Sequence, residues 1–195
     1  MKRRGFLVIL SGPSSAGKNT LLSAIKGRVP GMLYSISVTT RKPRPGERHG
    51  VDYFFLDDAE FTRLRDSGGL LEWAEYCGHY YGTPREFVED SLAAGHIVIT
   101  DIDIQGARQI RTAMPEAVAV FLMPPSLEEL QKRIVARGTD SEAAIKERMK
   151  RAVDEMKYVV DYDYWILNTD LDQAVTDLLA IITAERQRVE RTEFP

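Results

Sequence analysis

The sequence predicts an α/β fold in which helices cover both faces of a parallel sheet. Four short apolar runs are rich in Val, Ile and aromatic residues, which favours strands. These runs are nearly continuous rather than alternating, as expected for strands that are buried on both faces. Helical stretches separate them, and this alternation indicates parallel strands. The four runs are Phe6–Leu10, Ile97–Thr100, Val118–Met123 and Tyr164–Leu167.

The helices between these strands are marked at their ends. The segment Thr83-Pro84-Arg85-Glu86 predicts a capping box with proline at the first helical position, and Gly95 ends that helix. Two later helices each begin at a capping residue that Glu or Gln follows three positions on. They are Ser126 with Glu129, for a helix ending at Gly138, and Asp170 with Gln173, for a long amphipathic helix to about Arg188.

Two regions interrupt the alternation of strands and helices. Residues 37–94 hold short alternating segments and a loop rich in arginine and proline, and residues 130–158 are charged and helical. We interpret both as insertions at the rim of the sheet, where ligands of open α/β sheets bind. One domain is therefore expected, with a core of residues 1–36, 95–129 and 159–195.

Length and composition limit the class of protein. The chain has 195 residues, which suits one domain with insertions. Its hydrophobic fraction of 44% and charged fraction of 28% are those of a globular protein and exclude a disordered one. The formal net charge of −3 argues against a basic nucleic-acid binder, so we expect no nucleic-acid partner.

The sequence also favours a soluble cytoplasmic protein without a membrane partner. No apolar run approaches the length of a membrane span. The basic start Met-Lys-Arg-Arg resembles a signal peptide, but the apolar segment behind it is too short. The single cysteine, Cys77, excludes a disulfide framework and fits a reducing compartment. We interpret Cys77 as a packing or surface residue, and the three scattered histidines lack the spacing of a zinc site.

A glycine-rich loop follows the first predicted strand and opens a helix. It matches the phosphate-loop (P-loop) pattern GxxxxGK[ST] up to Lys18, in the structural context that the pattern needs. Glycines let backbone N–H groups converge on phosphate oxygens, and Lys18 would reach the terminal phosphates. The alternative is a plain glycine turn between strand and helix. The core is thus predicted to be a three-layer P-loop NTPase core, with ATP bound by Gly12, Ser14, Ser15, Ala16, Gly17, Lys18, Asn19 and Thr20.

One position of this loop departs from the pattern. Asn19 stands where Ser or Thr usually gives a hydroxyl to Mg²⁺, and an amide oxygen fits that hard cation less well. The predicted strand after residue 96 ends in Asp101, and such an aspartate lies near the metal in P-loop proteins, although many strands end in Asp. We expect Mg²⁺ to be held through the nucleotide, with Asp101 nearby and no certain protein ligand.

Beyond the loop, short motifs follow in a characteristic order. They are Ser37-Val38-Thr39-Thr40-Arg41-Lys42-Pro43-Arg44, Gly50-Val51-Asp52-Tyr53, Glu72-Trp73-Ala74, Tyr80-Tyr81-Gly82-Thr83, Asp101-Ile102-Asp103-Ile104-Gln105-Gly106, and Arg133 through Arg137-Gly138. In this order and spacing the motifs resemble the guanylate kinase family over nearly the whole chain. The resemblance implies transfer of the γ-phosphoryl group of MgATP to GMP, and to dGMP, giving ADP and GDP in purine nucleotide metabolism. It also implies that residues 37–94 bind GMP and that residues 130–158 form a lid.

The resemblance also implies roles for single residues. The GMP phosphate would be held by Ser37, Arg41, Arg44, Tyr53 and Tyr81, and guanine would be read by Glu72, Thr83 and Asp103. Arg133, Arg137 and Arg148 would close from the lid onto the phosphates, Asp101 would lie near them, and Asn168 would lie beside adenine. The residues expected to promote transfer are Lys18, Arg41, Arg133 and Arg148.

The chemistry of these residues agrees with such roles, although each has a plainer interpretation. Arginines bind phosphate through planar bidentate hydrogen bonds, but a basic turn can also be a solvated surface. A carboxylate at Glu72 can accept from guanine N1–H and N2–H, whereas adenine lacks that donor pair. Thr83 could contact the base or cap a helix. Much of the charge on residues 130–158 also suits a solvated helix face.

Two other functions remain open on sequence alone. Guanylate-kinase-like domains of scaffold proteins bind peptides and have lost catalysis, and Asn19 and Ser15 keep that alternative open. A kinase of the same build could also act on another phosphorylated small molecule. The sequence does not indicate an interface between subunits, so the chain could be a monomer or a homo-oligomer.

Overall fold

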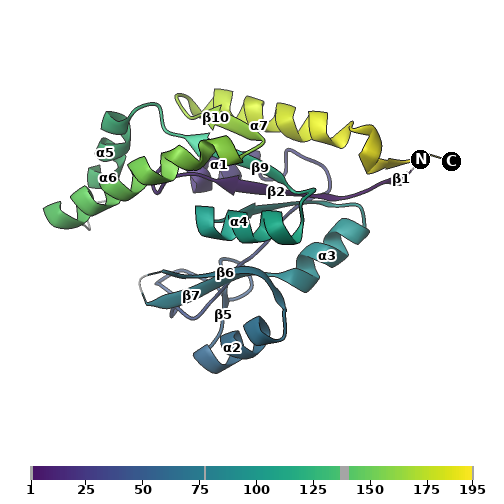
Figure 1. Ribbon diagram of the computed structural model, residues 1–195, viewed down its shortest axis with the longest axis horizontal. Helices are drawn as coiled ribbons and strands as arrows, with labels where there is room; N and C mark the ends of the chain where they lie inside the picture. The colour runs from purple at the N-terminus through teal and green to yellow at the C-terminus, as the bar shows by residue number, and fades with distance from the viewer. Residues whose placement is uncertain (1, 77, 137–140, 195) are drawn as a thin grey trace.

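The computed structural model describes residues 2–76, 78–136 and 141–194 (Figure 1). Its main sheet has five parallel strands in the order β10-β9-β2-β8-β3. The four predicted strands are confirmed as β2 (Phe6–Ser11), β8 (Ile97–Asp101), β9 (Val118–Met123) and β10 (Tyr164–Leu167). The edge strand β3 (Met32–Tyr34) was not predicted, because three partly exposed residues give no buried apolar run.

Helices cover both faces of this sheet, as predicted (Figure 1). Side chains of β2 alternate between the two faces, and each face has its own apolar core. Val8 and Leu10 pack with α1 (Lys18–Ile25) and α7 (Leu171–Arg186). Leu7 and Ile9 pack with α3 (Arg85–Ala93) and α4 (Ile104–Ala113). The strand that leads into the glycine loop is therefore fully buried, which makes it a rigid support for that loop.

The predicted helix ends are confirmed where a side chain caps the helix. The carboxylate of Asp170 accepts from the Gln173 N–H at the start of α7. The hydroxyl of Ser126 accepts from the Glu129 N–H at the start of α5 (Leu127–Ala136). Gly95, with a φ of 85°, follows the last turn of α3. The predicted end of α5 at Gly138 lies outside the described residues.

The predicted capping box at Thr83 is wrong. Helix α3 begins at Arg85, its N-cap is Pro84, and no side chain caps it. Thr83 instead lies in a strand opposite Glu72, and its buried hydroxyl donates to the Glu72 carboxylate. The local capping signal was outweighed by this partner from the neighbouring strand.

A second sheet, of order β5-β4-β7-β6, lies to one side of the main sheet (Figure 1). Its strands are β4 (Val38–Thr39), β5 (Phe54–Phe55), β6 (Leu70–Tyr76) and β7 (His79–Pro84). They share a small core with α2 (Asp58–Asp66) that is centred on Phe61. The side chain of Gln109 in α4 joins the two sheets, because it donates to the Trp73 carbonyl and accepts from the Trp73 N–H.

Helices α5 and α6 (Glu142–Met156) form a hairpin with its own apolar cluster of Leu130, Ile134 and Ala152. A short helix η1 (Lys157–Asp161) then leads into β10. After α7, the helix η2 (Val189–Arg191) precedes β11 (Thr192–Glu193), which pairs with β1 (Lys2–Arg3) and brings the two ends of the chain side by side (Figure 1). Over the described residues, every helix is too short or too polar to cross a bilayer.

Candidate active site

The glycine loop connects the buried strand β2 to the first turn of α1, as the motif predicts. Gly17 has a φ of 104°, and a Cβ there would lie 2.4 Å from the amide nitrogen of Asn168. Ser15 also adopts a left-handed conformation, with a φ of 70°. This backbone path ends at the N-terminus of α1, which begins at Lys18. Such an arrangement is suited to binding phosphate.

Lys18 lies between the loop and the end of the neighbouring strand. Its ammonium group donates to the Gly12 carbonyl at 2.8 Å and lies 3.9 Å from the Asp101 carboxylate. Burial raises the pKa of Asp101, and the charge of Lys18 opposes that rise. Asn19 and Thr20 lie on the exposed side of α1. Lys18 and Asp101 therefore form a partly buried charge pair at the carboxyl ends of two adjacent strands.

Side chains from α5, α6 and the end of β10 converge on the same loop. Arg148 donates to the Ser14 hydroxyl at 2.9 Å, and Arg133 donates to the Ala16 carbonyl at 3.2 Å. Asn168 is buried, and its amide group donates to the same Ala16 carbonyl at 2.7 Å. Three residues that are distant in sequence thus contact the glycine loop, whereas Arg137 lies outside the described residues.

At the other end of the site, Glu72 is a buried carboxylate. Its side chain is 5% exposed and accepts the Thr83 hydroxyl at 2.7 Å. A Cβ at Gly106 would lie 2.5 Å from a Glu72 oxygen, so only glycine leaves room for this carboxylate. Burial raises the pKa of Glu72 to about 7, the Thr83 hydroxyl opposes the rise, and the nearby Asp103 adds to it. Asp103 also caps α4, since it accepts from the Gly106 N–H at 2.8 Å.

The arginine-rich loop brings together a second group of residues. The guanidinium of Arg41 forms two hydrogen bonds of 2.9 Å with the Glu47 carboxylate. It lies 5.4 Å from the centre of the Tyr53 ring, and Tyr81 is another of its hydrogen-bond partners. The rings of Tyr53 and Tyr81 meet edge to face. The structure thus gathers three of the predicted phosphate-binding residues, Arg41, Tyr53 and Tyr81.

The other two residues that were predicted to bind the phosphate are Ser37 and Arg44. Ser37 precedes β4, where its carbonyl accepts from the Phe54 N–H. Arg44 is exposed, and its backbone N–H donates to Glu47 at 2.7 Å.

Electrostatic interactions link the two ends into one site. The Asp101 carboxylate acts on the pKa of Tyr53, and the Asp103 carboxylate acts on that of Glu72. Asp103 also acts on the pKa of Glu155, whose carboxylate accepts from the Ser14 N–H and faces Lys18. The two groups are also joined by the chain, since Glu72 lies against Gly106 of α4 and α4 begins just after Asp101, which lies 3.9 Å from Lys18.

Sequence reasoning missed two carboxylates of this region, Glu47 and Glu155. Glu47 lies within a basic turn, and its position three residues after Arg44 was the only available signal. Glu155 lies near the end of a highly charged helix, where it cannot be told from solvated neighbours. Both are recognised only through their partners in the folded chain.

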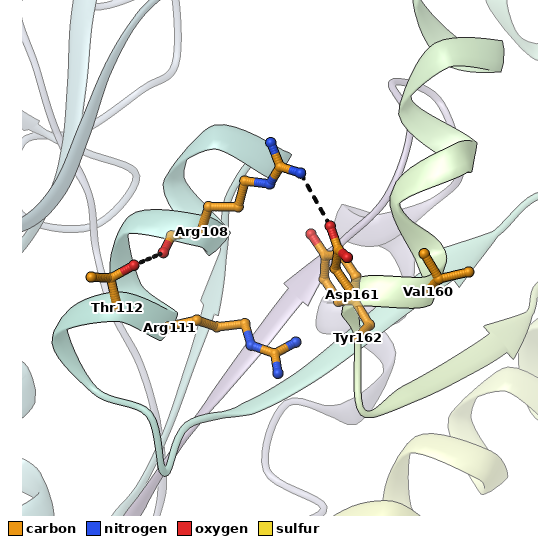
Figure 2. A pocket seen from close by; sticks show the side chains of 6 residues that line it. All are labelled: Arg108, Arg111, Thr112, Val160, Asp161 and Tyr162. Atoms are coloured by element: carbon orange, nitrogen blue, oxygen red, sulfur yellow. Dashed lines mark hydrogen bonds and ion pairs between the residues drawn. The ribbon is translucent and has the colours of Figure 1, made fainter.

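A hollow of about 550 Å³ lies between α4 and η1 and is lined by residues of these helices and by Tyr162 (Figure 2). Its arginines already have partners: Arg108 lies 3.2 Å from Asp161, and Arg111 lies 3.3 Å from Asp163. We assign no ligand to this hollow. Among the described residues, no three His, Cys, Asp or Glu side chains are grouped closely enough to hold a metal ion.

Comparisons with known proteins agree with the geometry. A family model described as guanylate kinase matches residues 4–185. A guanylate kinase of Shouchella clausii (strain KSM-K16) is 48% identical over 192 residues, which cover 98% of this chain and 94% of that protein. One of Desulfitobacterium hafniense (strain Y51) is 46% identical over 193 residues, covering 99% of this chain and 96% of that protein.

A solved structure gives the same result. The crystal structure of guanylate kinase from Anaplasma phagocytophilum has a TM-score of 0.79 and 36% sequence identity, and the match covers 98% of this chain and 91% of that chain. The family model spans most of the chain, and the curated relatives cover nearly all of it. The chain belongs to the guanylate kinase family.

Proposed function

We propose that this chain transfers the γ-phosphoryl group of ATP to GMP, and to dGMP, with ADP and GDP as the products. One observation carries the choice of acceptor: the buried carboxylate of Glu72 lies against Gly106 of α4, a helix that begins just after Asp101, the residue that Lys18 approaches. When ionised, Glu72 can accept from both N1–H and N2–H of guanine. Adenine would leave it unpaired, at a cost of about 1–3 kcal/mol or more.

The glycine loop forms the ATP end of the proposed site. Backbone N–H groups from Gly12 to Thr20 and the N-terminus of α1 would hold the phosphates. Lys18 would neutralise the charge that develops during transfer. Arg133 and Arg148 already contact the loop and would move onto the phosphates, with Arg137 as a third lid arginine. Asn168, fixed against Ala16, would border adenine.

The insertion forms the GMP end. Its phosphate, a dianion near neutral pH, would be bound by Arg41, Arg44 and the hydroxyl groups of Ser37, Tyr53 and Tyr81. Guanine would be read by Glu72, Thr83 and Asp103, while Asp101 and Arg148 would lie between the two ends. This assignment is supported by the contacts of Arg41 with Tyr53 and of Tyr53 with Tyr81, and by the burial of Glu72.

Catalysis then depends on position and charge. The two phosphates would be held in line, and no covalent enzyme intermediate or strong protein base is needed. We propose residues 37–94 as the GMP-binding insertion and 130–158 as the lid, on a core of residues 1–36, 95–129 and 159–195. Closure of both over the core would exclude water and so prevent hydrolysis of ATP.

Mg²⁺ fits the residues present. Mg²⁺ retains several waters and needs only one or two carboxylates beside the substrate phosphates, and Asp101 supplies one at the carboxyl end of β8. When bound with the nucleotide near Asp101, Mg²⁺ would supply positive charge that neutralises part of the phosphate charge. Asn19, exposed on α1, leaves the usual hydroxyl ligand missing. We place the reaction in the cytoplasm, in keeping with the single cysteine.

The acceptor specificity tests this proposal. ADP release from MgATP should be measured with purified protein and GMP, AMP, CMP or UMP as acceptor. We expect turnover with GMP far above that with the other three. No turnover with any acceptor, from protein shown to be folded, would contradict the proposal and would favour a catalytically inactive binding module.

A further inference from the structure

The arginine-rich loop contains an ion pair between Arg41 and Glu47. Both oxygens of Glu47 are used, since each accepts from Arg41 at 2.9 Å and one also accepts from the Arg44 N–H at 2.7 Å. The two side chains are only 11% and 19% exposed, unlike a solvated surface pair. The Arg41 guanidinium lowers the pKa of Glu47, and the Arg44 N–H lowers it further. Glu47 thus remains a carboxylate at neutral pH.

This pairing decides which donors of Arg41 are left for a ligand. A guanidinium has five N–H groups in a rigid plane. Three of them are used by the Glu47 carboxylate and the Lys42 carbonyl, through both terminal nitrogens. The remaining two are the Nε–H and the second Nη2–H, which share one edge of the plane and form a bidentate fork. Glu47 holds one edge and leaves the second edge, which the Tyr81 hydroxyl shares, to face a ligand with two phosphate oxygens.

The other neighbours of Arg41 fix where that edge lies. The guanidinium carbon of Arg41 lies over the rings of Tyr53 and Phe55, at 5.4 and 5.9 Å from their centres. The Tyr81 hydroxyl is a further partner of the same group. With Glu47 on one edge and these aromatic rings beside it, Arg41 is confined to one orientation near Tyr81.

We infer that Glu47 is a positioning residue for GMP: its carboxylate orients Arg41 so that the second edge of the guanidinium receives the GMP phosphate. Glu47 does not contact the ligand itself and acts through Arg41. It also ties the loop together at the Arg44 N–H. This inference rests on the proposed function, because it names a phosphate monoester as the group that Arg41 binds.

The test uses Glu47→Gln in the full-length protein, with Asp52→Asn as a matched control. Asp52 lies in the same loop and also accepts a backbone N–H, that of Arg48 at 2.8 Å. For Glu47→Gln we expect KM for GMP to rise about tenfold or more, because a charge-assisted hydrogen bond is weakened. We expect KM for ATP and the melting temperature to stay near wild type, and Asp52→Asn to leave both KM values unchanged.

A double-mutant cycle separates positioning from a general effect on the loop. The dissociation constant for GMP should be measured by calorimetry for wild type, Glu47→Gln, Arg41→Ala and the double variant. If Glu47 acts through Arg41, adding Glu47→Gln to Arg41→Ala changes the constant by less than about twofold. Equal effects of Glu47→Gln in both backgrounds would overturn the inference.

Other results would overturn it as well. A wild-type KM for GMP in Glu47→Gln would show that Arg41 needs no such support, and a lower KM would show that Glu47 competes with the phosphate. These outcomes are distinct from failure of the proposed function, in which the wild-type protein itself neither binds nor phosphorylates GMP.

Discussion

The two ends of the site are built by different means. At the glycine loop, the proposed binding groups are mostly backbone N–H groups, placed between a buried strand and a helix that packs on the main core. At the insertion, the proposed binding groups are side chains held by other side chains, Arg41 by Glu47 and Glu72 by Thr83. We therefore expect a substitution at an exposed position such as Asn19 to matter less at the first end than the loss of a pairing partner at the second.

The largest expected effect comes from Lys18, at the glycine-loop end of the site. For Lys18→Ala we expect kcat with GMP to fall by roughly a thousandfold, as when a group that stabilises transition-state charge is lost. Calorimetry with GMP alone should give a wild-type dissociation constant, since Lys18 lies at the other end of the site. Wild-type turnover in this variant would remove Lys18 from the proposed mechanism.

Next in size is the loss of the buried carboxylate at the insertion end. For Glu72→Gln we expect kcat/KM for GMP to fall by about a hundredfold or more, because the amide cannot accept from both guanine donors. The rate with AMP should change little, so the preference for GMP over AMP shrinks. If that preference is retained, another residue reads guanine.

The buried state of Glu72 predicts a pH dependence of stability. Its pKa of about 7 in the folded chain exceeds that of the unfolded chain, so folding retains a proton that the unfolded chain loses. The resulting cost is absent below about pH 4 and grows to roughly 3 kcal/mol above pH 7, as expected for this pKa difference. Urea unfolding of wild type and Glu72→Gln should therefore show the variant gaining stability over wild type as pH rises. A difference that is flat from pH 4 to 8 would contradict this account.

The smallest effect concerns the strain in the loop backbone. Ser15 adopts a φ of 70°, which costs a residue with a side chain about 1–2 kcal/mol relative to glycine. We expect Ser15→Gly to raise the free energy of unfolding by about 0.5–1 kcal/mol, after the entropy cost of glycine. Urea denaturation measures this change, and a loss of stability would mean that the Ser15 side chain stabilises the loop.

The contrast between features set by local sequence and features set by distant side-chain partners also explains what could be predicted from the sequence. The strands around Val8 and Val120 and the caps at Ser126 and Asp170 follow from local patterns, and the glycine loop is a contiguous motif. Local signals failed at Thr83, where a partner across the sheet replaced the expected cap.

Partners that meet only in the folded chain could not be predicted at all. The contact of Glu155 with the Ser14 N–H joins residues far apart in sequence. Short edge strands such as β3 and β11 were missed because two or three residues carry no periodicity. The roles of the arginines came from family resemblance, since a basic turn and a charged helix look alike whether or not they bind phosphate.

The central claim is that both ends of the site act on one phosphoryl group. The most direct test incubates the protein with Mg²⁺, GMP and ATP labelled at the γ-phosphoryl group, and then separates the products. We predict that the label appears in GDP, with little as inorganic phosphate. Label recovered as inorganic phosphate, or retained in ATP when GMP is present, would contradict the claim.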